Sequence, residues 1–193
     1  MELKPGILSD IDILAAIRNR ELVIEPFSRD CLGSWTYDCH LGTEFLIPRY
    51  DKITSIDPHK NKPEEYMEKI TLKEGDEFIL HPHRFVLATT TEFFEFGQQV
   101  VGISEGRSSL ARLGVMPHVQ VGIGEPGWKG RYTLELVNLN EVPVILRPND
   151  LIAQIYFFRL ISPSSNPYDK KHSAKYQNQQ TVIGSRYFLE ERK

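Results

Sequence analysis

Short extended segments dominate this sequence and restrict the chain to a mostly β fold. Between Leu22 and Ile161, β-branched and aromatic residues occur in short runs that Gly and Pro separate at fairly regular intervals. The segments with this pattern are 22–27, 44–49, 69–72, 77–83, 84–94, 100–104, 131–139, 142–148 and 151–161. Many short strands with turn residues between them are typical of a β-sandwich or a β-barrel. We therefore predict a mostly β fold with one or two short helices.

One segment near the N-terminus has helical spacing instead. Ser9 is a favourable helix N-cap, and Asp12 follows it in the first turn. Ile13 and Ile17 recur at the interval that places apolar side chains on one face of a helix. This pattern predicts a helix over residues 10–20.

Length and charge exclude several classes of protein. A chain of 193 residues can bury a substantial core as one domain. The formal net charge of -3 gives no bulk positive field to recruit nucleic acid or an anionic membrane. Cys31 and Cys39 make no disulfide framework, and no segment resembles a signal peptide or an apolar run of membrane length. We expect a cytoplasmic protein without nucleic-acid or membrane partners.

The chain divides into a β domain and a polar tail. Residues 1–161 contain all the strand-like segments, and residues 51–66 within them are polar enough to form a surface excursion. Residues 162–193 begin with a stretch rich in amides and proline, which predicts a mobile C-terminal tail.

Metal-binding patterns are weak. His81 and His83 flank a proline, but cysteine partners at a suitable spacing are lacking, so a surface turn explains them better than a zinc site. The H-x-E and P-C-x-x-C patterns of zinc-dependent nucleobase deaminases do not occur. The sequence predicts no zinc.

A compact polar cluster lies at residues 105–114, EGRSSLARLG. Ser108 to Leu113 fits one or two helical turns, and Gly114 suits a left-handed helix end. A serine that caps the turn would explain the hydroxyls, but not the arginines at both ends, Arg107 and Arg112. Backbone N–H groups, hydroxyls and guanidinium groups together form a good phosphate or carboxylate site.

A second candidate is the strand RYTLELVN, residues 131–138. Period-two alternation places Tyr132, Leu134 and Leu136 on one face and Thr133 with Glu135 on the other. A glutamate in mid-strand either faces solvent on a half-exposed sheet or lines a pocket as a proton-transfer group. In the tail, Tyr168, Lys175 and Gln179 offer a stacking ring, an ammonium and an amide, and such a tail could close over a ligand.

These segments occur together, and in this order, in one known family. The chain resembles deoxycytidine triphosphate (dCTP) deaminases, the zinc-free branch of the dUTPase-like superfamily. The matching motifs are TYDCHLG (36–42), GRSSLARLG (106–114), PGWKGRYTLEL (126–136), LRPNDLIAQ (146–154), and PY followed by AKYQNQQ (167–180). The resemblance covers residues 9–185. It implies a distorted β-barrel or jelly-roll subunit of dUTPase-like type, with residues 1–161 as the domain, residues 162–193 as the closing tail, and a homotrimer with intersubunit active sites.

The resemblance also implies a role for each candidate residue. Glu135 is the general base and acid for hydrolytic deamination of dCTP to dUTP and ammonia. Ser108 and Arg112 position the water and stabilise the adduct from a neighbouring subunit. The remaining implied contacts to the nucleotide come from Arg107, Ser109, Lys175 and Tyr168 at the phosphates, from Gln179, and from the backbone of Thr133 and Leu134 at the pyrimidine edge. Mg²⁺ is expected to bind with the triphosphate rather than in a protein cage.

One departure from the family bears on the product. Glu125 stands where the family usually has an aspartate that, in dUTPases and bifunctional deaminases, binds the sugar and activates the hydrolytic water. Residues 121–123, in contrast, resemble the small-residue segment of bifunctional members. The sequence favours dUTP as product, with a bifunctional enzyme that releases dUMP and diphosphate as the alternative. A dUTPase without deaminase activity, a silent nucleotide-binding regulator and a purely structural protein stay open, as does feedback by dTTP.

Overall fold

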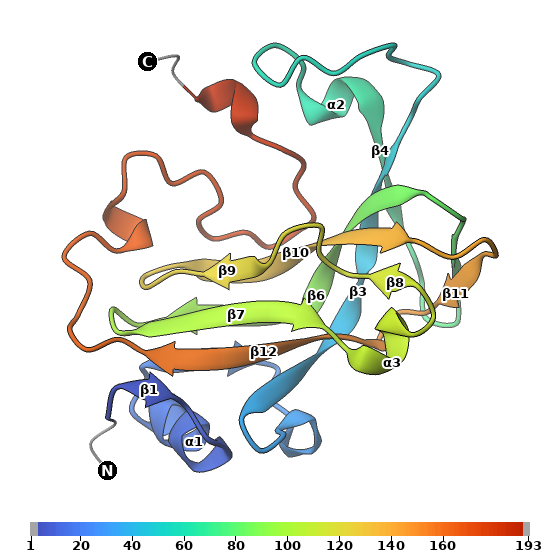
Figure 1. The fold of residues 1–193 in the computed structure, drawn as a ribbon. Coiled ribbons are helices and arrows are strands. Elements are labelled where there is room, and N and C mark those ends of the chain that lie inside the picture. The colour runs from blue at the N-terminus through green and yellow to red at the C-terminus, as the bar shows by residue number, and fades with distance from the viewer. Residues whose placement is uncertain (1–3, 191–193) are drawn as a thin grey trace.

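The structure, a computed structural model that describes residues 4–190, is built around one curled antiparallel sheet (Figure 1). Within the described residues, the ten strands of this sheet are β1 (Gly6–Ile7), β2 (Leu22–Glu25), β3 (Thr36–Pro48), β4 (Met67–Thr71), β6 (Phe85–Phe96), β7 (Val100–Gly106), β8 (Val115–Met116), β9 (Gly122–Gly124), β10 (Lys129–Asn138) and β12 (Leu151–Arg159). A separate two-stranded ribbon pairs β5 (Phe78–Leu80) with β11 (Val144–Leu146). The predicted mostly β architecture with few short helices is confirmed.

The sheet curls until its two ends approach each other. Its main path runs β8-β10-β6-β3-β12-β7-β9, while β1, β2 and β4 pair with β12, β6 and β3. Tyr132 of β10 reaches across the interior, and its hydroxyl donates to the carbonyl of Gly102 in β7 at 3.3 Å. A Cβ at Gly124 of β9 would lie 2.3 Å from the same hydroxyl oxygen, so only glycine permits this approach. Tyr132 therefore links the two ends of a half-barrel.

The core lies inside the curl. On β10, the side chains of Tyr132, Leu134 and Leu136 are 4%, 0% and 0% exposed, as the period-two pattern predicts. Phe94 and Phe157 pack in the same cluster from β6 and β12. This burial fixes which face of β10 is apolar and leaves the alternate residues on the other face.

The predicted N-terminal helix is present as α1 (Asp10–Arg18). Ser9 caps it in a capping box with Asp12, because the serine hydroxyl accepts from the Asp12 N–H while the Asp12 carboxylate accepts from the Ser9 N–H. The helix ends two residues earlier than predicted, because Asn19 is the C-cap and Arg20 has a left-handed φ of 58°. The other helical turns are α2 (Pro63–Tyr66), α3 (Ser108–Ala111), η1 (Arg29–Cys31), η2 (Tyr168–Lys170) and η3 (Tyr187–Leu189).

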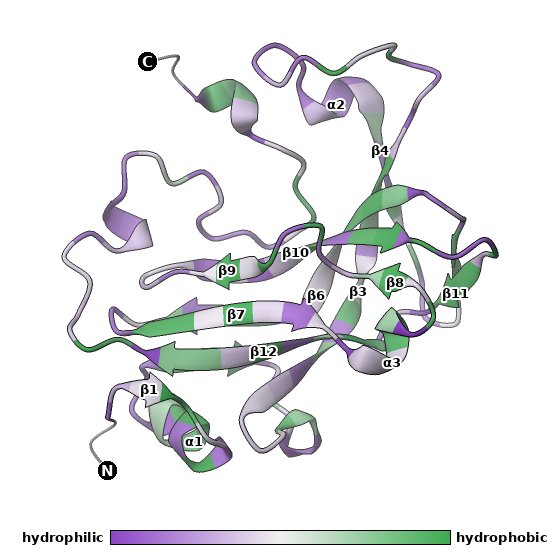
Figure 2. Cartoon of the chain, in the orientation of Figure 1, coloured by the Kyte–Doolittle hydropathy of each residue, from purple (hydrophilic) through white to green (hydrophobic). Residues whose placement is uncertain are grey.

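The C-terminal tail packs along the body of the protein. It lies beside β9 and β10, on the opposite side of the sheet from α1 (Figure 1). Its residues are mostly hydrophilic (Figure 2), yet Gln179 forms a parallel bridge with Gly130 of β10. Residues 1–3 of the predicted β domain and residues 191–193 of the predicted tail lie outside the described residues. No helix within residues 4–190 is long and apolar enough to cross a lipid bilayer.

Candidate active site

Glu135 lines a cavity of about 550 Å³ between β10 and the tail. Aromatic side chains contribute much of the wall, and they come from Trp128, Tyr132, Tyr168 and Tyr176. The polar groups of Thr133 and Gln179 lie in the same wall. Of the two interpretations of this mid-strand glutamate, the structure favours the pocket-lining one. A concave site with aromatic walls and few polar groups is suited to a small planar ligand.

The segment that precedes β9 holds Glu135 in place. The N–H of Gln120 donates to Oε2 of the carboxylate at 3.1 Å, and the N–H of Glu135 donates to the carbonyl of Pro117 at 2.8 Å. Among the described residues, no group donates to Oε1. One carboxylate oxygen is therefore fixed, and the other can accept a proton from a molecule in the cavity.

A gap in the edge of β10 lies next to this carboxylate. N–H groups of alternate strand residues point to the same edge, so the N–H and carbonyl of Thr133 face the same way as the Glu135 N–H. Within the described part of the chain, neither group of Thr133 has a backbone partner on that edge. Leu134 pairs with Ala88 of β6, so its backbone faces away and only Thr133 can meet a ligand there. The structure thus does not bring the predicted Leu134 backbone to the cavity.

The predicted tail residues lie at different distances from the cavity. The Gln179 amide donates to the hydroxyl of Thr133, and Tyr168 lines the wall. Lys175 lies behind Tyr168, because its N–H donates to the Tyr168 hydroxyl at 3.2 Å while its ammonium pairs with Glu190. Two of the three tail residues therefore contact the cavity directly.

Glu125 precedes the turn before β10. Its carboxylate forms an ion pair with the ammonium of Lys171 from the tail. This cation was absent from the sequence prediction, since 46 residues separate the two partners.

The cluster at residues 105–114 lies apart from the Glu135 cavity. The N-cap of α3 is Arg107 and receives no side-chain cap hydrogen bond, so neither serine caps the helix start. Ser108, Ser109 and Arg112 are exposed, and Gly114 ends the turn with a φ of 76°, as predicted. None of these residues lines the Glu135 cavity of their own chain. Any shared site must combine them with a second copy.

Asp38 holds Arg107 on the side of β3. The guanidinium Nη2 lies 3.1 Å from the Asp38 carboxylate, and both side chains are about a quarter exposed, at 29% and 24%. The interaction joins positions 69 residues apart, so no local sequence pattern indicates it.

A second cavity of about 350 Å³ opens beside α3 and β8. His118 lies in its wall at 8% exposure, with Nε2 at 2.9 Å from the Ser104 hydroxyl. Around it Val119, Val121 and Leu139 are 59%, 41% and 58% exposed. An apolar rim of this kind is typical of a surface that contacts another protein.

His118 predicts a pH dependence of stability. Burial lowers its pKa from 6.5 to about 4. Between pH 7 and pH 5 the unfolded chain therefore gains a proton that the folded protein does not take up, so the free energy of unfolding falls by about 2 kcal/mol. Urea unfolding at both pH values measures this loss. A His118→Asn variant is expected to lose less, and an equal loss in the variant would contradict the assignment.

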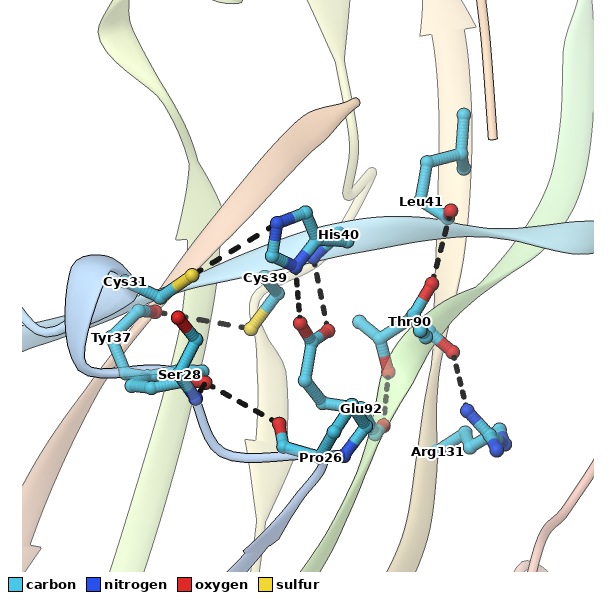
Figure 3. Close-up of polar contacts among 11 residues, drawn as sticks. Pro26, Ser28, Cys31, Tyr37, Cys39, His40, Leu41, Thr90, Glu92 and Arg131 are labelled. Carbon is cyan, nitrogen blue, oxygen red and sulfur yellow. Dashed lines mark hydrogen bonds and ion pairs between the residues drawn. The ribbon is translucent and has the colours of Figure 1, made fainter. Parts of the chain in front are cut away.

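A third polar group lies between β3 and β6 (Figure 3), and its residues Glu92 and His40 line neither cavity. Glu92 is 1% exposed, and its carboxylate accepts from the backbone N–H of His40 at 3.0 Å and contacts Nδ1 of the same residue at 2.5 Å. The thiol of Cys31 lies 3.9 Å from the other imidazole nitrogen. Burial raises the pKa of that thiol, so this cysteine is a poor nucleophile.

Metal ligands do not cluster in the described part of the chain. Within residues 4–190, no group of three or more His, Cys, Asp and Glu side chains could hold a metal ion.

Comparison with known proteins now identifies the family. Residues 7–160 match the family described as dCTP deaminase-like. The chain belongs to the dCTP deaminase-like family. Its relatives include dUMP-forming dCTP deaminases of Dictyoglomus turgidum, 42% identical over 93% of this chain and 94% of the relative, and of Halobacterium salinarum, 43% identical over the same shares. A dCTP deaminase of Haloarcula marismortui is 40% identical over 90% of each chain.

A solved structure supports the fold of this dCTP deaminase-like chain. The dCTP deaminase from Agrobacterium tumefaciens superposes with a TM-score of 0.63 at 18% identity, over 81% of this chain. The match spans 49% of that longer protein, so it bears on the fold alone.

Proposed function

We propose that this chain is a dCTP deaminase that releases dUMP and diphosphate. The observation that carries the proposal is Glu135, which lies in an aromatic-walled cavity beside the open edge of Thr133. The dUMP-forming relatives at 42% and 43% identity support this product over dUTP, which the sequence alone favours.

Glu135 serves the deamination step as base and then as acid. Its carboxylate takes a proton from water, and the resulting hydroxide adds to C4 of the cytosine ring. Glu135 passes this proton to N3, then takes the proton of the C4 hydroxyl and passes it to the amino group, which leaves as ammonia while C4 becomes a carbonyl. The free N–H and carbonyl of Thr133 bind the pyrimidine edge, as an unpaired strand does in a sheet. Gln179 already bonds the Thr133 hydroxyl and contacts the nucleotide when the tail is closed.

Basic groups around the cavity bind the triphosphate. Arg107 and Ser109 reach it from a neighbouring subunit, and Lys175 and Tyr168 reach it from the tail. Lys175 has a carboxylate partner, Glu190, which a phosphate can replace. Mg²⁺ accompanies the triphosphate and neutralises part of its charge, and the oxygens of the phosphates hold it.

A homotrimer completes the site. Ser108 and Arg112 are exposed and lie outside the Glu135 cavity of their own chain, so a second copy must supply them. The apolar side chains of Val119, Val121 and Leu139 next to α3 give such a contact its buried surface. The number of subunits follows from the family resemblance.

Formation of dUTP alone is the second candidate. Glu125 is longer by a methylene than the usual aspartate, and its carboxylate is paired with Lys171. Both features displace the group that activates water for diphosphate release. The dCTP deaminase of Haloarcula marismortui, at 40% identity, is consistent with this product.

A product assay decides between these functions. Protein is incubated with dCTP and Mg²⁺, and dUTP, dUMP, ammonia and diphosphate are separated over time. We expect dUMP and diphosphate in equal amounts with ammonia. Accumulation of dUTP would support the second candidate, and an absence of turnover would contradict both.

A further inference from the structure

One ion pair attaches the tail to the body of the protein. Lys171 pairs with Glu125, and the two side chains are 29% and 37% exposed. Among the charged pairs within residues 4–190, it is the only one that joins a residue beyond Ser162 to the β domain. The attachment point is the turn that leads into β10, the strand that carries Glu135.

The tail approaches this turn closely. The N–H of Tyr168 donates to the carbonyl of Pro126 at 2.7 Å. Gly127 has a φ of 79°, and a Cβ there would lie 2.5 Å from the Asp169 carboxylate, so a larger residue would push the tail away. Lys171 follows directly, with its ammonium 6.0 Å from the centre of the Tyr168 ring. An interaction that fixes Lys171 therefore also fixes Tyr168 in the cavity wall.

Further hydrogen bonds continue the contact along β10. The indole N–H of Trp128 donates to the carbonyl of Tyr176 at 3.0 Å, and the N–H of Asn178 donates to the carbonyl of Lys129 at 2.9 Å. These bonds hold Tyr176 and Asn178, which lie at the other end of the tail segment 167–180 from Lys171. At the Lys171 end, the ion pair and the bond from Tyr168 to Pro126 together hold the tail.

We propose that Lys171 is a positioning residue, whose ion pair with Glu125 holds the tail closed over the Glu135 cavity and keeps Tyr168 at its wall. The identity of the ligand in the Glu135 cavity rests on the proposed function. The closure of the tail is a property of the nucleotide-free protein. Lys170 offers a matched control, since it is exposed and forms no ion pair within the described residues.

Hydrogen exchange of the nucleotide-free protein tests the closure. In Lys171→Met, amides of residues 167–180 are expected to exchange about 2- to 5-fold faster, as fits the loss of a partly exposed ion pair. Lys171→Arg should restore the slower exchange, and Lys170→Met should not change it. Glu125→Gln should match Lys171→Met, and the double variant should exchange no faster than either one. Unchanged exchange in Lys171→Met, or an equal change in Lys170→Met, would overturn the proposal.

Kinetics with dCTP then connect the closure to the reaction. Lys171→Met is expected to raise KM for dCTP about 2- to 5-fold with kcat within twofold, because the open tail reduces the population that can bind. Unchanged KM alongside faster exchange would overturn the positioning role. If the exchange result holds but the wild-type protein neither binds nor converts dCTP, the proposed function fails while the closure by Lys171 stands.

Discussion

Replacement of Glu135 with glutamine is expected to lower the rate of ammonia release from dCTP at least about a hundred-fold, the lower end of the range for general acid–base catalysis. Glutamine has the same shape, and its carbonyl oxygen can still accept from the Gln120 N–H. The amide cannot take a proton from water, so the attacking hydroxide does not form. Ammonia release measures the rate, and calorimetry of dCTP binding is expected to show affinity within a few-fold of wild type.

Glu105 supplies the control for this change. It begins the polar cluster at residues 105–114, is exposed, and its carboxylate accepts only from the Tyr156 hydroxyl, at 3.4 Å, within the described part of the chain. Glu105→Gln is therefore expected to retain wild-type activity. If Glu135→Gln keeps more than a tenth of the wild-type rate, another group moves the proton.

Glu135→Gln also tests whether the active site is shared between subunits. Arg112→Ala is also expected to be inactive, because we propose that Arg112 stabilises the adduct from the neighbouring subunit. Coexpression of Glu135→Gln with Arg112→Ala in equal amounts places both native residues together at about one quarter of the intersubunit sites in a cyclic oligomer. Recovery of activity toward that fraction supports the shared site. Mixed oligomers without recovered activity would place both residues in one subunit's site.

Local patterns predicted the parts of the fold that local chemistry determines. The capping box at Ser9 fixed where α1 begins, and period-two alternation identified the buried face of β10. It also placed Glu135 opposite that face. The short strands β8 and β9 escaped prediction, because segments of two and three residues carry no periodicity and exist only through their pairing with β10 and β7.

Contacts between distant segments limited what could be predicted of the site. Arg107 was identified from its own motif, but its partner Asp38 lies in another motif, and only the fold joins them. Lys171 belongs to the tail, whose polar composition predicted mobility. Backbone hydrogen bonds between the tail and β10 instead pack the tail against the β domain. The Leu134 backbone was expected at the cavity, but it faces the other edge of β10. The sequence alone does not tell which edge of a strand a backbone group faces.

Removal of the Glu92 carboxylate is expected to lower the free energy of unfolding by about 3 kcal/mol, the lower end of the range for breaking a buried pair. The carboxylate is buried and contacts His40 at two nitrogens (Figure 3), so Glu92→Ala deprives both of a partner. The lower end applies because the His40 side chain is 28% exposed and can regain water. For a chain of this size the melting temperature is expected to fall by about 6–12 °C, which calorimetry measures.

Glu92→Gln is the matched variant, because its amide keeps the shape and can still bond His40; it is expected to lose about 1–2 kcal/mol. The Thr90 hydroxyl donates to the Glu92 carbonyl at 2.8 Å and accepts from the Tyr132 N–H at 3.1 Å, one residue before Thr133. Because this carbonyl belongs to the backbone, both variants keep the bond, and KM for dCTP is expected to stay within about twofold of wild type at temperatures where the protein is still folded. A Glu92→Gln stability equal to that of wild type would show that the charge contributes nothing, and a raised KM in Glu92→Ala would show that loss of the carboxylate also displaces β10.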